Sequence, residues 1–556
     1  MSLYYEAEKF LAGTSGGSEK EGQAGGSLKA RIFNAKNLKS TPSQVYALVT
    51  EASKWSSVLK EVIERAGILK FERKITPILA LLLVHDLLLV KRGIAAPEKH
   101  VLRVAVEKYK ARLRAEFTKE RVKRGCGSLE EWRIQVEKEY FNASSAQNLQ
   151  ETPTNADAQN GKVLNKKWAH PRWVRVNTLK TTLETQLATT FSKYRRVQTI
   201  DEVLEVAFDS RAELVLHIDL HIPNLIALPS STQLSTSPAY QQGLLILQDK
   251  ASCFPAYLLD PKPTDGDVID ACAAPGNKTT HLAALLGQLS DAEEVPRIWA
   301  YDKDKGRAGI LKKIVNIAGA DKFVTTKAGQ DFLRVDPNQE PWSKVGAVLL
   351  DPSCSGSGIV GRDDMPVFSL PVKETAGVSL TSKKRKRKGT DFSKDKPVHI
   401  GEPEEAADPE TENGSSEKLR DRLKSLSAFQ TKLLLHALSF PCARKVSYST
   451  CSIHEEENEG VILAALESPI AQARGWRLLL RNEQVFGVKT WLIRGDPDGF
   501  EGKDATAAKQ LADACIRCRR GSKEGTQGFF VACFVRYGDL DVQALSEEEW
   551  EGFGDE

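Results

Sequence analysis

Two cysteines stand at the ends of apolar, β-prone runs of the sequence. VLLDPSC ends on Cys354, with Asp351 three residues before it, and KVSYSTC ends on Cys451. A free cysteine at such a position is most often a small hydrophobic core residue. Both of these, however, are flanked by hydroxyl side chains, and a thiolate is a strong nucleophile. We therefore predict that the two thiols and the carboxylate share a reaction site at the carboxyl ends of parallel strands.

Four carboxylates follow Cys451 within eight residues: Glu455, Glu456, Glu457 and Glu459. We expect them to lie in the first turn of the next helix, where negative charge suits the helix dipole. A catalytic role is the alternative, but a nearby carboxylate raises the pKa of a thiol and makes it less reactive. The predicted role of these carboxylates is structural.

A second candidate site is the stretch DVIDACAAPGNKT, residues 267–279. It predicts a strand ending on Asp270, then a turn in which Ala273, Ala274 and Gly276 let the backbone approach a ligand, and then a helix near Thr279. Folds with alternating strands and helices bind their ligands at such a turn.

Acidic residues end the next two predicted strands. Asp302 is placed to accept hydrogen bonds from a ribose, and Asp331 to contact an adenine amino group. The chain lacks a G-x-G-x-x-G phosphate cradle and a Walker lysine, so a nucleoside cofactor without a pyrophosphate is favoured. S-adenosylmethionine fits that description. The alternatives are a helix cap for Asp302 and a surface charge for Lys278.

The elements that must position these residues begin near Gly266. Apolar strands, glycine-containing turns and helical stretches alternate from there, which predicts an α/β fold with a doubly wound, Rossmann-like parallel sheet. A helix over residues 422–440 and the strands KVSYSTC and GFFVACFVR complete it. WVRVNTLK and the runs that follow predict a smaller α/β unit, similar to an RNA-recognition motif, before the sheet.

Apolar residues at helical spacing predict a helical N-terminal domain. Its longest apolar run, residues 75–90, carries His85 and Asp86 and falls short of the roughly 20 residues of a membrane-spanning helix, so we expect a buried helix and no membrane association. Residues 91–124 hold twelve basic and four acidic side chains. This excess suggests a polyanion-facing surface. The last predicted helix of the domain, residues 101–124, is either RNA-contacting or a solvated helix face.

The expected organisation has six parts. These are a disordered N-terminus (1–27), the helical domain (28–141), a linker (142–165), the small α/β unit (166–247), the doubly wound sheet domain (248–540) and an acidic tail (541–556). Residues 361–416 form an insert too polar to build a core. Its KKRKRK run predicts a nuclear-localisation or nucleic-acid-binding patch, unless it is only solvated charge.

Composition limits the remaining possibilities. With 78 Lys and Arg against 74 Asp and Glu, the net charge of +4 says little about partners. The first residues lack the basic start and apolar segment of a signal peptide, so we expect the nine cysteines to be thiols. Cys515 and Cys518 form a CxxC pair without a second pair or a histidine at zinc spacing, so no metal site is predicted.

Six motifs together resemble a known family. DACAAPGNKT, DPSCSGSG, FQTKLLLHAL and VSYSTCS followed by EENE, with RVNTLK and LQDKAS upstream, are similar in order and spacing to the motifs of the Nol/Nop/Sun family of RNA (cytosine-5) methyltransferases. The resemblance covers residues 173–536. Ser353 replaces the family's more usual second proline and Asn277 its second glycine, and both features resemble the Rcm-type eukaryotic branch that acts on large-subunit ribosomal RNA.

The resemblance implies a role for each residue. Cys451 is the expected nucleophile, Cys354 the group that helps to release product, and Asp351 the partner of ring nitrogen 3 of the base. The expected cofactor-binding residues are Cys272, Ala273, Ala274, Pro275, Gly276, Asn277, Lys278, Asp302, Arg307, Asp331 and Asp351.

The resulting hypothesis is an S-adenosylmethionine-dependent enzyme that forms 5-methylcytosine in large-subunit (25S/28S) ribosomal RNA during ribosome biogenesis, acting as a monomer in the nucleolus of the nucleus. Methylation of transfer RNA is an alternative, because the family shares its catalytic motifs. A non-catalytic, RNA-binding ribosome-assembly factor is another, although such a scaffold would not need Cys354, Cys451 and Asp351 together.

Overall fold

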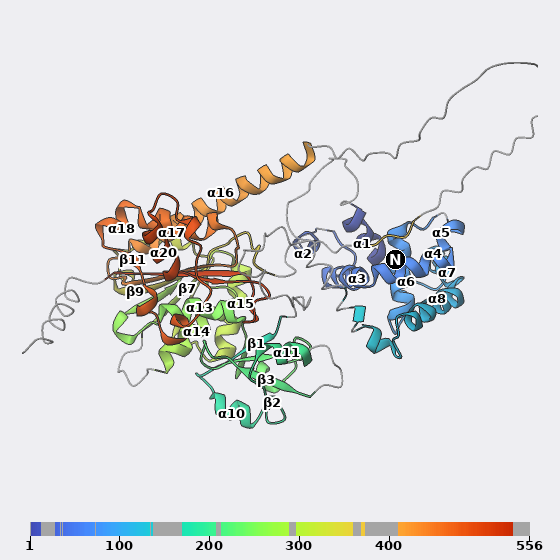
Figure 1. Cartoon of the computed structure of the whole chain (residues 1–556), viewed down its shortest axis with the longest axis horizontal. Coiled ribbons are helices and arrows are strands. Elements are labelled where there is room, and N and C mark those ends of the chain that lie inside the picture. Colours follow the sequence, from blue (N-terminus) through green and yellow to red (C-terminus); the bar gives the residue numbers. More distant parts are fainter. Residues whose placement is uncertain are drawn as a thin grey trace, which may run out of the picture. The chain divides into compact units, whose positions relative to one another are not determined.

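The computed structural model describes residues 2–12, 28–33, 35, 37–72, 74–133, 135–136, 139, 170–206, 213–288, 296–359, 368–372 and 410–536 (Figure 1). The chain divides into two compact units, Met1–Tyr140 with Met365–Arg420, and Phe141–Asp364 with Asp421–Glu556. The expected linker, the KKRKRK run and the acidic tail lie outside the described residues.

The first unit is helical. Its helices are α1 (Ser2–Ala12), α2 (Leu28–Phe33), α3 (Pro42–Lys54), α4 (Ser56–Ala66), α5 (Ile68–Phe71), α6 (Pro77–Leu89), α7 (Val101–Glu107) and α8 (Lys110–Lys123). The expectation of disorder over 1–27 is wrong for α1. Tyr4, Ala7 and Leu11 recur at helical spacing and are buried in the core of this unit, which holds the helix in place.

Helix α6 is the buried helix expected from the apolar run. The Thr76 side chain caps it by accepting from the Leu79 amide, and Pro77 occupies its first turn. Among the described residues, no helix is long and apolar enough to cross a membrane.

The second unit begins with a five-stranded sheet in the order β2-β3-β4-β1-β5. Its strands are β1 (Arg172–Val176), β2 (Arg195–Arg196), β3 (Val215–Ile218), β4 (Leu225–Leu228) and β5 (Leu245–Leu247), and its helices are α10 (Leu183–Ala188), α11 (Ile200–Val206) and α12 (Pro238–Gln241). All its pairings are antiparallel except β2 with β3.

An eight-stranded sheet follows, in the order β11-β13-β10-β9-β6-β7-β8, with β12 also paired to β13. The strands are β6 (Asp267–Asp270), β7 (Ile298–Asp302), β8 (Val324–Ala328), β9 (Val345–Leu350), β10 (Lys445–Thr450), β11 (Arg477–Leu478), β12 (Ile516–Cys518) and β13 (Phe529–Val535). The five strands from β10 to β8 are parallel, and β13 pairs antiparallel with its neighbours.

Helices cover both faces of this sheet, as expected for a doubly wound fold. On β9, Leu349 packs into the core beneath α13 (Lys250–Leu259), α14 (Asn277–Gly287) and α15 (Lys305–Ala318), whereas Val348 and Leu350 pack on the opposite side. There the cover is α16 (Glu410–Leu438), α17 (Glu459–Leu466), α18 (Pro469–Ala473) and α20 (Ala505–Ala514). Figure 1 shows the two layers, and the short helix α19 (Phe486–Lys489) completes the unit.

The insert expected over 361–416 contains two described stretches. Phe368 and Leu370 pack against the core of the helical unit, and the amides of Ser369 and Val372 donate to Ser56 and Glu64. Helix α16 begins at Glu410, inside the expected insert. The expectation of a structureless insert is wrong at these two places, because two apolar side chains anchor the first and the second continues a long helix.

Candidate active site

The two predicted thiols lie together. Strands β9 and β10 pair in parallel, with Leu350 opposite Tyr448, so the chain leaves both strands at the same edge of the sheet. Cys354 and Cys451 follow these ends, and their Sγ atoms are 3.1 Å apart. Cys354 is buried and Cys451 is partly exposed. The partly exposed thiol is therefore the one that a substrate can reach.

Asp351 lies between two polar groups at this edge. Its Oδ2 accepts from the Lys278 ammonium at 2.8 Å, and its Oδ1 accepts from the Ser449 hydroxyl at 2.9 Å. Lys278 also donates to the Ser252 hydroxyl at 3.0 Å. The cofactor-side turn and the cysteine-bearing strands are thus joined through one ion pair.

The electrostatic surroundings of the two thiols favour different protonation states. The hydrogen bond with Cys451, burial and the charges of Cys451 and Asp351 all raise the pKa of Cys354, which keeps it a neutral thiol. Burial lowers the pKa of Lys278, but the charge and hydrogen bond of Asp351 more than offset this and hold the pKa above its usual value. A cation therefore lies in the neighbourhood of Cys451, where it favours a thiolate.

The loop that carries Cys354 is anchored by Glu457. This fully buried carboxylate accepts from the Ser355 amide at 2.9 and 3.2 Å, and from Gln430 Nε2 at 2.9 Å. Gln430 Nε2 also donates to the Ser353 carbonyl at 3.0 Å. Both residues bordering Cys354 are consequently fixed through their backbones.

The four carboxylates do not start one helix. Residues 455–457 form a 3₁₀ turn, and α17 begins only at Glu459. Glu459 is fully buried, with Arg517 as its partner at 2.5 Å. Glu459 lies in the first turn of α17, as predicted, whereas Glu455, Glu456 and Glu457 precede that helix. The expected structural role fits the contacts of Glu457 and Glu459, which buried donors hold.

The cofactor-side turn connects β6 to α14. Asp270 ends the strand and accepts from the Thr279 hydroxyl at 2.7 Å, while its other oxygen is buried without a hydrogen-bond partner. Burial raises the pKa of Asp270 to about 7. Gly276 has φ +118°, and a Cβ there would meet Leu311 at 3.1 Å, so the backbone conformation favours glycine.

The predicted acidic residues at the next strand ends take up different surroundings. Asp302 is buried and accepts from the amides of Ala274 and Asp304 at 3.3 and 2.9 Å. Arg307 donates to the Ala274 carbonyl at 2.7 Å and lies 3.6 Å from Asp302. Asp331 is paired with Lys303 at 3.2 Å, at the end of β8. The turn 272–278 thus contacts Asp302 and Arg307 directly, whereas Asp331 stands one strand further along.

Several residues that hold the site together were not predicted as site residues, namely Ser252, Gln430, Ser449 and, as a titrating group, Asp270. They lie in the quoted motifs LQDKAS, FQTKLLLHAL, VSYSTCS and DACAAPGNKT, so a signal for each was present in the sequence. Glu457 was predicted to be structural, but its partners Ser355 and Gln430 are distant in the sequence and carry no local signal.

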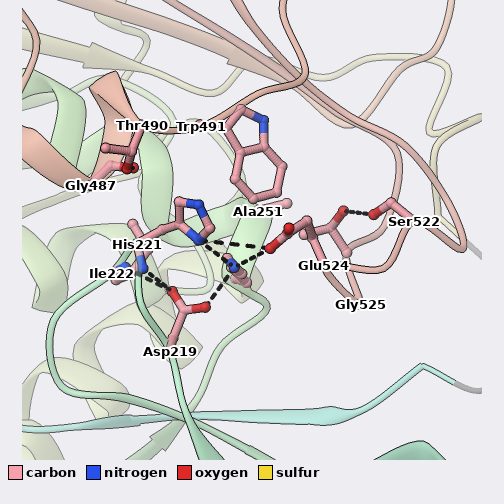
Figure 2. Close-up of polar contacts among 12 residues, drawn as sticks. Asp219, His221, Ile222, Ala251, Gly487, Thr490, Trp491, Ser522, Glu524 and Gly525 are labelled. Carbon is pink, nitrogen blue, oxygen red and sulfur yellow. Dashed lines mark hydrogen bonds and ion pairs between the residues drawn. The ribbon is translucent and has the colours of Figure 1, made fainter. Parts of the chain in front are cut away.

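A buried ionic cluster fixes the smaller sheet beside the larger one. The Lys250 ammonium lies 2.5 Å from Asp219 Oδ1, 3.2 Å from Glu524 and 3.1 Å from His221 Nδ1. Figure 2 shows Asp219, His221 and Glu524 converging beside the ring of Trp491. The lysine side chain is 1% exposed, so this contact is fully desolvated.

All nine cysteines are free thiols. Cys515 and Cys518 are buried in the core around β12, and burial raises the pKa of both. Across the described ranges, no group of three or more His, Cys, Asp or Glu side chains is arranged to hold a metal ion.

Three family models match the chain. Residues 43–131 match the N-terminal domain of NOL1/NOP2/Sun domain family member 5, and residues 170–248 match the ferredoxin-like domain of the same protein. Residues 256–374 match the model described as 16S rRNA methyltransferase RsmB/F. The first match lies within the helical unit, the second spans the smaller sheet, and the third covers strands β6 to β9 of the larger sheet.

Curated proteins are similar over nearly the whole length. The chain is 34% identical over 533 residues to a protein of Schizosaccharomyces pombe named 25S rRNA (cytosine-C(5))-methyltransferase rcm1, covering 96% of this chain and 91% of that protein. It is 34% identical over 548 residues to a Mus musculus protein named 28S rRNA (cytosine-C(5))-methyltransferase, with the same coverages. A Drosophila melanogaster protein of the latter name is 26% identical over 518 residues, covering 92% of each chain.

Proposed function

Since the chain belongs to the NOL1/NOP2/Sun family of RNA (cytosine-C5) methyltransferases, we propose that it methylates carbon 5 of a cytosine in large-subunit ribosomal RNA, with Cys451 as nucleophile. The observation that carries this assignment is the pair of thiols 3.1 Å apart at the ends of two adjacent parallel strands. The relatives named for 25S and 28S ribosomal RNA, matched over 91% of their lengths, support the substrate.

The residues around the β6–α14 turn fit S-adenosylmethionine. The turn brings a glycine-dependent backbone segment and the N-terminus of α14 next to a buried carboxylate, Asp302, with no phosphate cradle. The residues that would hold the cofactor are Cys272, Ala273, Ala274, Pro275, Gly276, Asn277, Lys278, Asp302, Arg307, Asp331 and Asp351. When bound, the cofactor supplies an electrophilic methyl group on a sulfonium.

Cys451 activates the base. Carbon 5 of cytosine is a poor nucleophile until a thiolate adds to carbon 6 and converts the ring into an enamine. Cys451 is the partly exposed thiol of the pair, and Lys278 provides a cation close enough for the Cys451 charge to raise the lysine pKa. The same interaction favours the Cys451 thiolate.

Cys354 releases the product. In the free enzyme its pKa is raised by the hydrogen bond with Cys451, by burial and by the charge of Cys451, so it holds its proton. Once the Cys451 sulfur is bonded to carbon 6, it is a neutral thioether, so both contributions of Cys451 are removed and the pKa of Cys354 falls. Cys354 then gives its proton to solvent and becomes a thiolate. After carbon 5 has been methylated, this thiolate accepts the carbon 5 proton, and Cys451 leaves carbon 6 by elimination.

Asp351 and Lys278 act at ring nitrogen 3 of the base. Negative charge develops at ring nitrogen 3 as the thiolate adds, and a proton or positive charge is needed there. The Lys278–Asp351 pair, 2.8 Å apart and held by Ser449 and Ser252, supplies both a cation and an orienting carboxylate. We assign Asp351 to orient the base and Lys278 to supply the positive charge.

The target cytosine must leave its stack to reach these strand ends, so the RNA is unpaired or locally flipped. The smaller sheet of β1–β5 and the basic residues 91–124 are the proposed RNA-positioning surfaces. The proposed domain boundaries are those predicted from the sequence, with α1 and residues 368–372 added to the helical domain and residues 410–416 assigned to α16. A monomer acting in the nucleolus completes the proposal.

The test is bisulfite sequencing of total RNA from cells lacking this protein, rescued with the wild-type chain or Cys451→Ala. The expected result is one large-subunit cytosine that loses its methyl group and regains it only with the wild type. Loss at a transfer RNA cytosine instead would reassign the substrate. No change in any RNA, or full rescue by Cys451→Ala, would leave the chain as a non-catalytic assembly factor.

A further inference from the structure

Helix α6 of the helical unit contains two polar side chains that its apolar surroundings do not explain. Ten of its thirteen residues are buried, and His85 and Asp86 are among them, 5% and 6% exposed. Burying an imidazole and a carboxylate costs free energy unless both are hydrogen-bonded. The partners of this pair therefore indicate what it is built to do.

Asp86 is fixed from two sides. Its Oδ2 accepts from the Tyr4 hydroxyl at 2.5 Å, and the Tyr4 oxygen in turn accepts from the Ala95 amide at 2.8 Å. Its Oδ1 lies 3.0 Å from His85 Nδ1. Because a carboxylate only accepts, this contact places a proton on Nδ1, and in the neutral ring Nε2 is then a hydrogen-bond acceptor with a fixed direction.

His85 lines a cavity of about 330 Å³, which is within the range of about 300–1,000 Å³ of small-molecule sites. The other lining residues are Glu51, Lys54, Trp55, Leu89, Val90, Arg133 and Val136. The apolar lining consists of the Trp55 indole, which is 4% exposed, and three aliphatic side chains, and the charged lining groups are two cations and one carboxylate.

The cations are held in place at the cavity. Lys54 pairs with Glu51 at 2.8 Å, and the Arg133 guanidinium donates to the Leu89 carbonyl at 3.1 Å. Arg133 Nη1 lies 3.9 Å from Glu130, and the two side chains are 43% and 75% exposed, so the guanidinium of this exposed pair can also meet an anion from solvent. An oriented acceptor, an aromatic wall and an exposed guanidinium are the groups that bind a base and its phosphate.

We propose that this cavity binds one unpaired nucleotide of the RNA substrate, with the base against Trp55, a base amino group donating to His85 Nε2, and a phosphate at Arg133. The inference rests on the proposed function, because the nucleotide belongs to the same RNA as the target cytosine. Val90 in the cavity wall leads directly into residues 91–124, whose excess of eight basic side chains favours a polyanion over a protein partner.

The experiment is an anisotropy titration of the full-length chain with a fluorescein-labelled, unpaired RNA of about 12 nucleotides, and with the same RNA carrying abasic sites. Arg133→Glu and His85→Phe are compared with Lys74→Glu, which makes the Arg133 charge change at an exposed residue that does not line the cavity. Loss of one base contact corresponds to about tenfold in affinity.

The expected result is about tenfold weaker binding for Arg133→Glu and for His85→Phe, with Lys74→Glu close to wild type. The abasic RNA should bind the wild type more weakly and lose its sensitivity to His85→Phe. Circular dichroism shows whether His85→Phe is folded, and Arg133→Glu, at an exposed side chain, decides the question if it is not.

Equal RNA affinity for wild type, Arg133→Glu and Lys74→Glu would overturn the inference and would leave the cavity to a protein partner or to packing alone. Methylation of the target cytosine is measured in parallel. If the wild type methylates the cytosine and Arg133→Glu does not change RNA affinity, only the cavity proposal is refuted. If the wild type does not methylate, the proposed function is refuted, and the titration still decides whether the cavity binds RNA.

Discussion

Glu457→Gln tests the claim that a buried carboxylate positions the catalytic loop. Glu457 accepts from the Ser355 amide and from Gln430, and neither contact reaches solvent. Hydrogen bonds to a charged group contribute about 1.5–3 kcal/mol each. Both donors bind Oε1, and Oε2 accepts only the longer branch from the Ser355 amide. Glutamine can keep its oxygen at the Oε1 position, but its amide group then faces the Ser355 amide and the negative charge is gone, so the loss corresponds to about one such bond.

The expected consequence falls on Cys354, because the anchored backbone flanks it on both sides. If the whole loss of about 1.5–3 kcal/mol enters the step in which Cys354 takes the carbon 5 proton, that step slows by about tenfold to one hundred and fifty-fold. Addition of Cys451 should be less affected, because Cys451 lies on the other strand. Covalent enzyme–RNA complex should therefore accumulate.

The assay is single-turnover methylation of an unpaired RNA containing the target cytosine, with denaturing gels to quantify covalent complex. Glu456→Gln is the matched control, since it makes the same change at the exposed neighbouring carboxylate. Equal rates for Glu457→Gln and Glu456→Gln, or a Glu457→Gln variant that loses covalent complex together with product, would refute the reasoning.

Two further predictions concern buried charges. Burial raises the pKa of Asp270 to about 7, against about 3.9 in an unfolded chain, so the folded state holds this proton more tightly and the free energy of unfolding falls as pH rises from about 4 to 7. Asp270→Asn should remove this loss and should be more stable than the wild type by up to roughly 4 kcal/mol above pH 7. The free energies of unfolding of variant and wild type are measured in urea at pH 5 and pH 8. An equal difference between the two proteins at both pH values would contradict the prediction. Lys250→Met leaves Asp219, 1% exposed, without its cation, which should destabilise the chain by about 3–5 kcal/mol. The double variant Lys250→Met/Asp219→Asn should recover part of this lost stability. If Lys250→Met alone lowers the free energy of unfolding in urea by less than about 1 kcal/mol, the ionic cluster does not fix the two sheets together.

The fold and the proximity of the two thiols follow from local patterns in the sequence. VLLDPSC and KVSYSTC are apolar runs that end on polar residues, and parallel strands place their carboxyl ends at one edge. That is sufficient to bring Cys354 and Cys451 together, as the pairing of Leu350 with Tyr448 does. The family resemblance, resting on six ordered motifs, is confirmed by the relatives.

Long-range ion pairs and single buried hydrogen bonds could not be predicted. Lys250 and Glu524 are 274 positions apart, and nothing in either neighbourhood indicates the other. Glu457 stands in a run of carboxylates that looks solvated, yet it is fully buried. Helix α1 was missed for another reason. Its apolar spacing is present, but the Gly- and Ser-rich residues after it dominate the composition of the first 27 positions.

The central proposal is that Cys451 is the nucleophile and that Cys354 releases the product. Denaturing gel analysis of cysteine variants tests both roles. The wild type, Cys354→Ala, Cys451→Ala and the double variant are incubated with S-adenosylmethionine and a large-subunit ribosomal RNA fragment containing the target cytosine. We expect a covalent RNA complex that accumulates only in Cys354→Ala and that requires Cys451. A complex that forms in Cys451→Ala, or turnover of Cys354→Ala at the wild-type rate, would contradict it.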